Sequence, residues 1–240
     1  TADKLANAIN TSIAAKAPIA SPVFTGNVGI GNASPGQELD ISSTNPAVRL
    51  TDTTTSGLYH DLVSFGNDLR FSADGGNVQA DTNIEFYIDN AEKMRITSDG
   101  IVTKPSQPSF GANATTTNIP ITTQTTVTLN ERFDVGGNLA SNVFTAPVTG
   151  KYLITYMFYF SNVDTAHTTL DVTVVTSNKV YQQTWAMNKI LSSDGNFSIS
   201  SSSVCDMDAS DTLYIRVYVA GGTAQTDIHG DSTASCYLLG

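Results

Sequence analysis

The sequence predicts an all-β protein in which a short N-terminal helix and a slender β-shaft precede a larger β-sandwich. Residues 27–104 contain short alternating apolar runs, separated by dipeptides that favour hairpin turns: Asn67-Asp68, Gly75-Gly76 and Asp89-Asn90. From about Lys104 onward the strands are longer and recur at the spacing of a sandwich. Only the first residues of the chain show a helical pattern.

Composition argues against several functions. The chain has 240 residues, of which 14% are charged, against about 25% in typical soluble domains. Its formal net charge is −10 and it has no Lys/Arg cluster, so we expect no nucleic-acid partner. No apolar run approaches the ~18 residues of a membrane span, and no secretory signal is visible. Because the sequence begins at Thr1, we expect a processed chain or a fragment. Two cysteines are too few for a disulfide scaffold, so we expect Cys205 and Cys236 to be buried free thiols.

Residues 1–26 are predicted to form a short helix and a connector. Leu5, Ile9 and Ile13 recur at helical spacing, and Pro18 ends the pattern. One such helix is too short to be stable alone, although three copies packed about an axis would support one another. The alternative is a frayed terminal helix. Pro18 and the second proline, Pro22, make the following residues stiff and extended.

Residues 27–104 are predicted to form a shaft that needs more than one chain. Their strands are short, and the apolar face of each strand is thin. Such a segment cannot build an independent core, whereas three chains can share one. We therefore expect a slender trimeric β-shaft, with an ordinary small β domain as the alternative.

The segment Tyr152–Phe160 is predicted to be a strand with two apolar faces. Tyr152, Ile154 and alternate residues face one way, whereas Met157 and Tyr159 face the other. A strand of this kind must be covered on both sides, and a second copy of the chain can provide the outer cover. The alternative is a central strand that one subunit covers on both faces. The predicted subunit interface consists of Tyr152, Ile154, Tyr156, Met157, Phe158, Tyr159 and Phe160.

Several phrases in the first hundred residues resemble bacteriophage tail fibres. Residues 16–26 (KAPIASPVFTG) resemble a connector of these fibres, and residues 27–35 (NVGIGNASP), 39–41 (LDI) and 91–100 (AEKMRITSDG) resemble one of their modules. The resemblance implies the distal part of a homotrimeric fibre that binds a bacterial cell-surface receptor, either lipopolysaccharide or an outer-membrane protein. It also implies assembly in the host cytoplasm, a place in the virion, and contact with other tail proteins through an N-terminal part that precedes this sequence.

The second half of the chain resembles the heads of complement C1q-like and tumour-necrosis-factor-like proteins. The resemblance lies in Phe144–Tyr152 (FTAPVTGKY), Asp211–Val217 (DTLYIRV) and Ser232–Leu239 (STASCYLL). Ala234 and Cys236 depart from the family pattern in the last phrase. The resemblance implies a ten-strand jelly-roll sandwich that forms compact trimers. The predicted parts of the chain are therefore residues 1–26, a shaft of 27–104 and a head of 105–240.

Successive loops of an antiparallel sandwich alternate between its two ends, which predicts the binding surface. By this count, loops 161–168, 187–195 and 221–232 share one end, whereas 176–179 and 206–210 lie at the other. Function concentrates on loops that a rigid scaffold holds. The predicted receptor-binding residues are Asp164, His167, Asn188, Lys189, Asp194, Asp227, His229 and Asp231.

The sequence carries no catalytic motif. None of His60, His167 and His229 belongs to a G-x-S-x-G elbow or an H-x-x-x-H pair, so we expect no enzyme. The alternatives to an adhesin are a fibre-borne polysaccharide depolymerase and a structural virion fibre or collar protein. We expect that no cofactor is required. Asp227, His229 and Asp231 offer Ca²⁺ ligands if three copies meet near an axis, with a solvated loop as the alternative.

Overall fold

The computed structural model describes residues 24–223 and 225–239, so the predicted helix over residues 1–17 lies outside the described residues. The chain divides into two compact units, Thr1–Phe86 with Arg95–Thr103, and Tyr87–Met94 with Lys104–Gly240. The predicted boundaries at residues 26 and 104 remain predictions. No described helix is long and apolar enough to cross a membrane.

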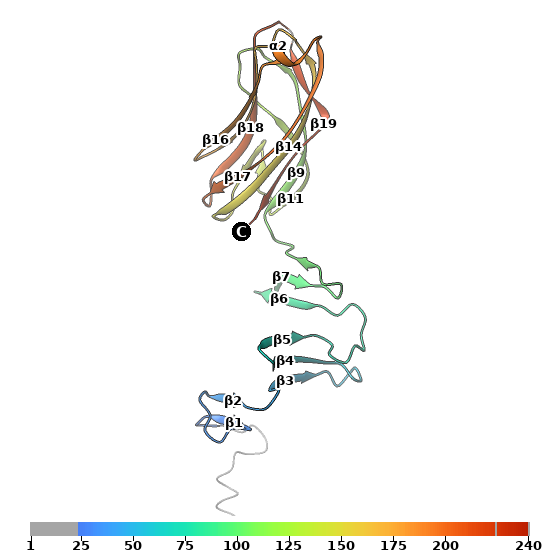
Figure 1. The fold of residues 1–240 in the computed structure, drawn as a ribbon, viewed down its shortest axis with the longest axis vertical. Helices are drawn as coiled ribbons and strands as arrows, with labels where there is room; N and C mark the ends of the chain where they lie inside the picture. The colour runs from blue at the N-terminus through green and yellow to red at the C-terminus, as the bar shows by residue number, and fades with distance from the viewer. Residues whose placement is uncertain (1–23, 224, 240) are drawn as a thin grey trace, which may run out of the picture. The chain divides into compact units, whose positions relative to one another are not determined.

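Residues 24–103 form three small sheets, which Figure 1 shows in blue to green. Strands β1 and β2 pair in parallel, and the other two sheets have the orders β3-β4-β5 and β6-β7-β8. The bounds are β1 Val28–Ile30, β2 Leu39–Ile41, β3 Ala47–Thr51, β4 Tyr59–Phe65, β5 Asp68–Ser72, β6 Ile84–Ile88, β7 Ala91–Ile96 and β8 Val102–Thr103.

Two of the three predicted hairpin turns are present. Asp89 and Asn90 join β6 to β7 with φ angles of 52° and 59°, the left-handed pair typical of a tight hairpin. The β4–β5 turn consists of Gly66 and Asn67, one residue earlier than predicted. The prediction for Gly75-Gly76 was wrong, because these residues lie in the long connection between β5 and β6.

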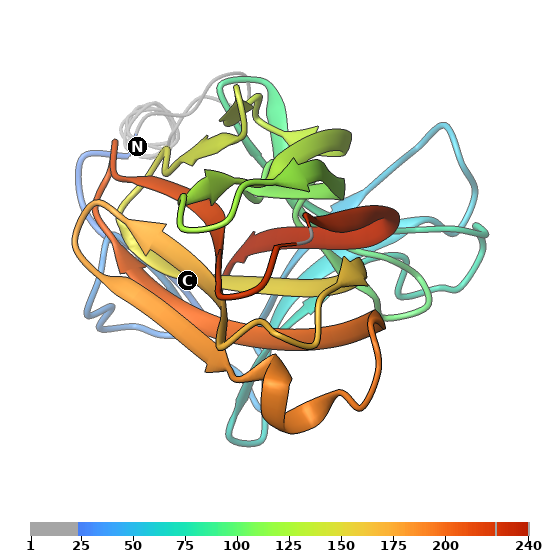
Figure 2. The same cartoon turned by 90° about the horizontal axis from the view of Figure 1, so that it is seen from above.

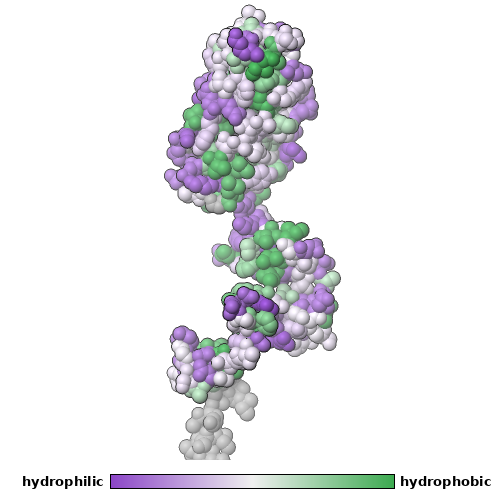
Figure 3. Space-filling model, in the orientation of Figure 1, coloured by the Kyte–Doolittle hydropathy of each residue, from purple (hydrophilic) through white to green (hydrophobic). Residues whose placement is uncertain are grey.

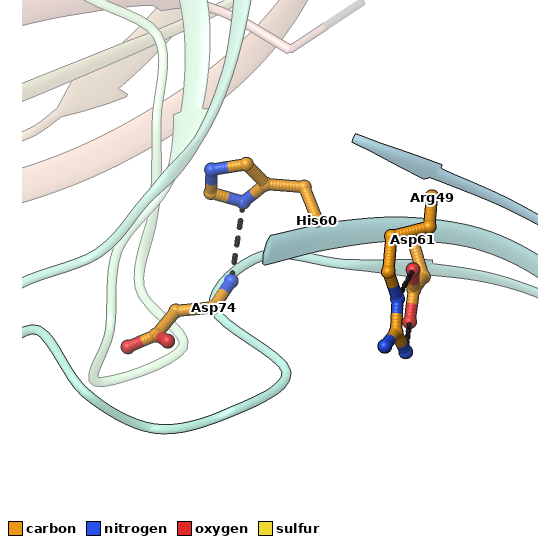
Figure 4. A network of polar contacts seen from close by, with 4 residues as sticks. All are labelled: Arg49, His60, Asp61 and Asp74. Atoms are coloured by element: carbon orange, nitrogen blue, oxygen red, sulfur yellow. Dashed lines mark hydrogen bonds and ion pairs between the residues drawn. The ribbon is translucent and has the colours of Figure 1, made fainter. Parts of the chain in front are cut away.

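Polar contacts hold that connection. The Asp74 backbone N–H donates to His60 Nδ1 at 3.1 Å, as Figure 4 shows. The Asp74 carboxylate accepts the backbone N–H groups of Gln79 at 2.8 Å and Val78 at 2.9 Å, which hold the pKa of Asp74 below its usual value. On the same sheet, Arg49 pairs with Asp61 through two hydrogen bonds of 2.9 and 2.8 Å.

The apolar faces of these sheets are uncovered within one chain. No hydrophobic side chain in residues 24–103 is buried, and Leu50 and Phe71 are each 66% exposed. Figure 3 shows apolar side chains gathered on the surface of the small sheets. Burial of apolar surface is the main force that stabilises folded chains. Within one chain, residues 24–103 obtain little of this stabilisation.

Residues 109–238 form a two-layer β-sandwich, seen from above in Figure 2. One sheet has the order β11-β9-β19-β14-β17, and the other has the order β12-β13-β18-β15-β16, with β10 paired to β18. The fold class predicted from the sequence, an all-β chain with a sandwich, is therefore confirmed. The bounds are β9 Ser109–Ile119, β10 Thr125–Thr126, β11 Thr128–Val135, β12 Leu139–Ala140, β13 Val143–Thr145, β14 Gly150–Val163, β15 Thr169–Thr176, β16 Val180–Trp185, α2 Met187–Ile190, β17 Gly195–Met207, β18 Thr212–Ala220 and β19 Thr226–Leu238.

Strand β14 lies in the five-stranded sheet between β17 and β19, and its inner face fills the core. Tyr152, Ile154, Tyr156, Phe158 and Phe160 are at most 5% exposed. These five residues therefore cannot contact another subunit, which corrects the predicted interface. Met157, 49% exposed, and Tyr159 point outward as predicted. Cys205 and Cys236 are buried free thiols, as predicted, and burial raises the pKa of Cys236 to about 12.

The clearest differences from the sequence-based expectation concern three elements. The eleven-residue strand β9, rich in Thr, Asn and Ala, was not predicted, because its alternation of apolar residues is weak. Strand β19 begins at Thr226, so residues 226–232 are not a loop. Residues Met187–Ile190 form the single-turn helix α2, where only a loop was expected.

Candidate functional site: the far end of the sandwich

The strand register places the three predicted loops at one end of the sandwich, which we call the far end. Val163 pairs with Gly195 where β14 ends and β17 begins, and Thr169 pairs with Ala220 where β15 begins and β18 ends. The far end therefore comprises residues 164–168, 186–194 and 221–225, of which 224 lies outside the described residues. The opposite, near end holds residues 177–179 and 208–211.

Asp164 ties two of these loops together. Its carboxylate accepts the backbone N–H groups of Ala166 at 2.7 Å and Thr223 at 2.9 Å. Gly222, at φ 72°, allows this approach, because a Cβ there would lie 2.4 Å from Asp164 Oδ2. The Asp164 side chain is buried and committed to its neighbours, so it is not free to contact a receptor.

His167 is fully buried between the same loops. Its Nδ1 lies 2.6 Å from the carbonyl oxygen of Gly221, which can only accept, so Nδ1 carries a proton and donates it. Its Nε2 lies 3.0 Å from the hydroxyl of Thr226. The prediction that His167 binds a receptor is therefore wrong, and its side chain instead fixes the loop after β18 to the start of β19.

Two more predicted carboxylates also hold loops in place. Asp194 Oδ1 accepts the backbone N–H and the hydroxyl of Thr165 at 2.7 and 2.8 Å. Asp227 accepts the Asn118 backbone N–H at 2.6 Å through one oxygen and the Asn162 amide at 2.7 Å through the other. Carboxylates that accept backbone N–H groups stabilise tight turns. These two aspartates therefore preorganise the far end.

The remaining predicted residues are exposed and lie on two elements. Asn188 and Lys189 belong to α2, whose Asn188 backbone N–H donates to the His167 carbonyl at 2.9 Å. His229 and Asp231 lie on β19, where the two side chains approach to 3.2 Å. The structure places these pairs on separate elements.

Ile190 was missed by the sequence analysis and is 50% exposed on α2, whereas Met187 of the same turn is buried. The signal available was the apolar pair Ile190-Leu191 directly after Asn188 and Lys189, in a segment expected to be a loop. Figure 3 shows apolar side chains beside polar ones at this end of the sandwich. Helix α2 therefore presents an amide, a cation and an apolar side chain together.

His229 and Asp231 lie in a bulge of β19. Ile228 pairs with Thr116 and Ser232 pairs with Ala114, so three residues of β19 face one residue of β9. The buried Ser232 hydroxyl accepts the Tyr159 backbone N–H at 2.9 Å, which compensates for the interrupted ladder. The His229 ring packs edge-on against Tyr159 at 5.4 Å. The bulge thus lies against the outer face of β14.

The predicted metal ligands do not gather into a site within one chain. Among residues 24–223 and 225–239, no group of three or more His, Cys, Asp or Glu side chains is arranged to hold a metal ion. Both oxygens of Asp227 already accept hydrogen bonds, as described above. Ca²⁺ binding therefore remains an untested prediction that needs ligands from several chains.

No protein-family model matches the sequence, and no curated protein matches it. Several solved structures are similar to the chain at low identity. The globular domain of zebrafish complement 1qA is 15% identical, with a TM-score of 0.40, and the similarity covers 56% of this chain and 98% of that one. Murine APRIL is 14% identical, with a TM-score of 0.41, and the similarity covers 55% of this chain and 99% of that one. Eiger TNF from S. frugiperda is 15% identical, with a TM-score of 0.39, and the similarity covers 56% of this chain and 94% of that one. The fold class rests on the strand order and register given above.

Removing the Thr226 hydroxyl should destabilise the far end. In Thr226→Val the buried Nε2 of His167 loses its partner, and we expect the free energy of unfolding to fall by about 1–3 kcal/mol. Thr223→Val, at an exposed position of the same end, should change it by less than about 0.5 kcal/mol. Chemical denaturation measures both variants, and equal stabilities would refute the structural role assigned to His167.

Proposed function

We propose that this chain is the distal part of a bacteriophage tail fibre, and that three copies form an adhesin for a bacterial surface receptor. The observation that carries the proposal is a contrast within one chain. Residues 109–238 surround a full hydrophobic core, whereas residues 24–103 bury no hydrophobic side chain. A segment without a core needs partner chains, and its phrases resemble those of tail fibres.

The β3-β4-β5 sheet indicates what kind of partner it needs. On one face, Leu62 pairs with Val48 and Phe71, and a groove of about 360 Å³ runs beside them. The opposite face carries the Arg49–Asp61 pair. An apolar face with both a groove and protruding side chains is suited to packing against copies of itself. In a trimer of identical chains, each small sheet would also lie beside the same sheet of the other two chains.

The sandwich offers a second surface for the same trimer. The outer face of the five-stranded sheet carries Met157 on β14, Val204 on β17, and Tyr237 on β19, each between 42% and 52% exposed. Register places Leu153 between Val204 and Tyr237. We assign the head interface to these outward residues, in place of the five buried ones predicted from the sequence.

The receptor contact of the proposed adhesin is the far end, centred on α2. Asn188, Lys189 and Ile190 are exposed, and the turns beside them are held by buried polar contacts, which suits a preorganised binding surface. Three copies per fibre would raise avidity without requiring a strong single site. The fibre would belong to the virion, assemble in the host cytoplasm, and contact other tail proteins.

The shared apolar face can be tested by cross-linking. With Phe71→Cys, oxidation of the full chain should give disulfide-linked species, because Phe71 faces the groove that we assign to another copy. Arg70→Cys is the matched control, since neighbouring residues of a strand point to opposite faces. The native thiols are buried and should not contribute. Equal cross-linking of the two variants, or none of either, would contradict a shared face.

The receptor surface can be tested with a matched pair of dipeptides. Changing both Asn188 and Lys189 to Ala should weaken attachment to host cells at least tenfold, because both side chains project from the far end. The same change at Asn178 and Lys179, an identical dipeptide at the near end, should leave attachment unchanged. Cell-binding assays on folded oligomers measure both. The reverse result would place the receptor contact at the near end.

A further inference from the structure

The outer face of the six-stranded sheet carries a row of large side chains that the contacts above leave unexplained. On β18, Tyr214, Arg216 and Tyr218 point outward and are half-buried, whereas the residues between them fill the core. Two tyrosines separated by four residues of strand stand roughly 13 Å apart. This distance exceeds the length of one sugar ring.

Neighbouring strands surround this row with hydroxyl, amide and carboxylate groups. Tyr218 pairs with Asp171 of β15, and Asp171 pairs with Thr184 of β16. Arg216 pairs with Thr173, which in turn pairs with Gln182. Gln182 and Thr184 are exposed, and the Gln182 amide donates to Thr184 Oγ1 at 3.2 Å. Across its width, the face therefore alternates aromatic and hydrogen-bonding side chains.

Two opposite charges on this face lack partners. Arg216 Nε and Asp171 Oδ1 are buried, and neither has a hydrogen-bond partner among the described residues. The two side chains lie on adjacent strands, with Arg216 opposite Thr173, two residues from Asp171, yet no ion pair within 4.0 Å joins them. A buried polar group without a partner is costly, so the pair requires an explanation. One group that both donates and accepts, such as a hydroxyl, would satisfy both atoms.

The charge of the face restricts the partner further. The outward positions of β15, β16 and β18 carry one acid, Asp171, and one base, Arg216, so this surface is formally neutral. The whole chain has a net charge of −10. An acidic polymer therefore meets less repulsion here than on a surface with the chain's average charge, and a neutral polymer meets none. The face lacks the basic cluster that a nucleic acid needs.

We infer that this face binds a polysaccharide chain. The apolar faces of two sugar rings of one polysaccharide chain would pack on Tyr214 and Tyr218, and the tyrosine side chains would turn to contact these rings. This movement would open Arg216 and Asp171 to a sugar hydroxyl between the rings. The inference rests on the proposed adhesin function, and it names the chemical class of its receptor.

The same surface continues toward the predicted receptor residues. Strand β16 ends at Trp185, and α2 begins two residues later at Met187. The paired residues Tyr218, Asp171 and Thr184, which lie side by side on three strands, are therefore at the end of the sheet that leads to α2. A sugar chain long enough to span the tyrosines could extend to Asn188 and Lys189.

The test compares binding of the full chain to two fractions of a bacterium to which it attaches. One fraction is the polysaccharide released by mild acid, and the other is the envelope protein. Calorimetry should show binding to the polysaccharide, and monosaccharides from its complete hydrolysis should compete poorly. Changing Tyr214 and Tyr218 together to Ala should lower the affinity at least tenfold. Changing both to Phe, which keeps the rings, should alter it by less than about threefold.

The outcomes separate this inference from the proposed function. Attachment that a protease abolishes, with no binding to the polysaccharide, would overturn the inference and leave the adhesin with a protein receptor. Arg216→Gln provides a second variant should the alanine pair misfold, and its unchanged affinity for the polysaccharide would also overturn the inference. Failure to attach to any bacterium would overturn both proposals.

Discussion

The burial of apolar surface is the constraint on which the rest of this structure depends. Strand β14 satisfies it on one side, where Phe158 and its alternating neighbours fill the sandwich core. The outer side of the same sheet keeps Met157 half exposed, and the small sheets leave Leu50 and Phe71 mostly exposed. One chain therefore meets the constraint only in part, and the proposed trimer is the arrangement that would meet it throughout.

The far end of the sandwich is ordered by a different interaction. Here polar contacts fix the loops: Asp164 and Asp194 accept backbone N–H groups, and the buried His167 contacts the loop after β18 and the start of β19 through its two ring nitrogens. These contacts hold the loops beside α2, and a binding surface whose surroundings are already ordered loses less conformational freedom on binding. The acidic character of this end is thus largely structural rather than available for a ligand.

The sequence predicted well the features that depend on the alternation of apolar residues. The inward face of β14 and the half-buried strands β15 and β18 follow from a period of two, and the loop parity follows from the strand count. Strand β9 was missed because small and hydroxyl side chains occupy most of it. One of its small residues is required by packing: a Cβ at Gly111 would lie 2.4 Å from the ring of Phe133.

The candidate site was harder to predict than the fold. A polar loop residue gives no indication in the sequence of whether it faces solvent or a backbone N–H. His167 and Asp164 were therefore selected together with Asn188 and Lys189, although only the last two are exposed. The extension of β19 through the bulge at His229 could not be predicted from the sequence either. There the Ser232 hydroxyl accepts the Tyr159 backbone N–H in place of a hydrogen bond between the two backbones.

The molecular mass of the full chain in solution tests the central claim most directly. Sedimentation equilibrium at micromolar concentration should give three times the chain mass of 25.4 kDa, with no detectable monomer. A stable, folded species of one chain mass would contradict the account, because the uncovered faces would then need no partner.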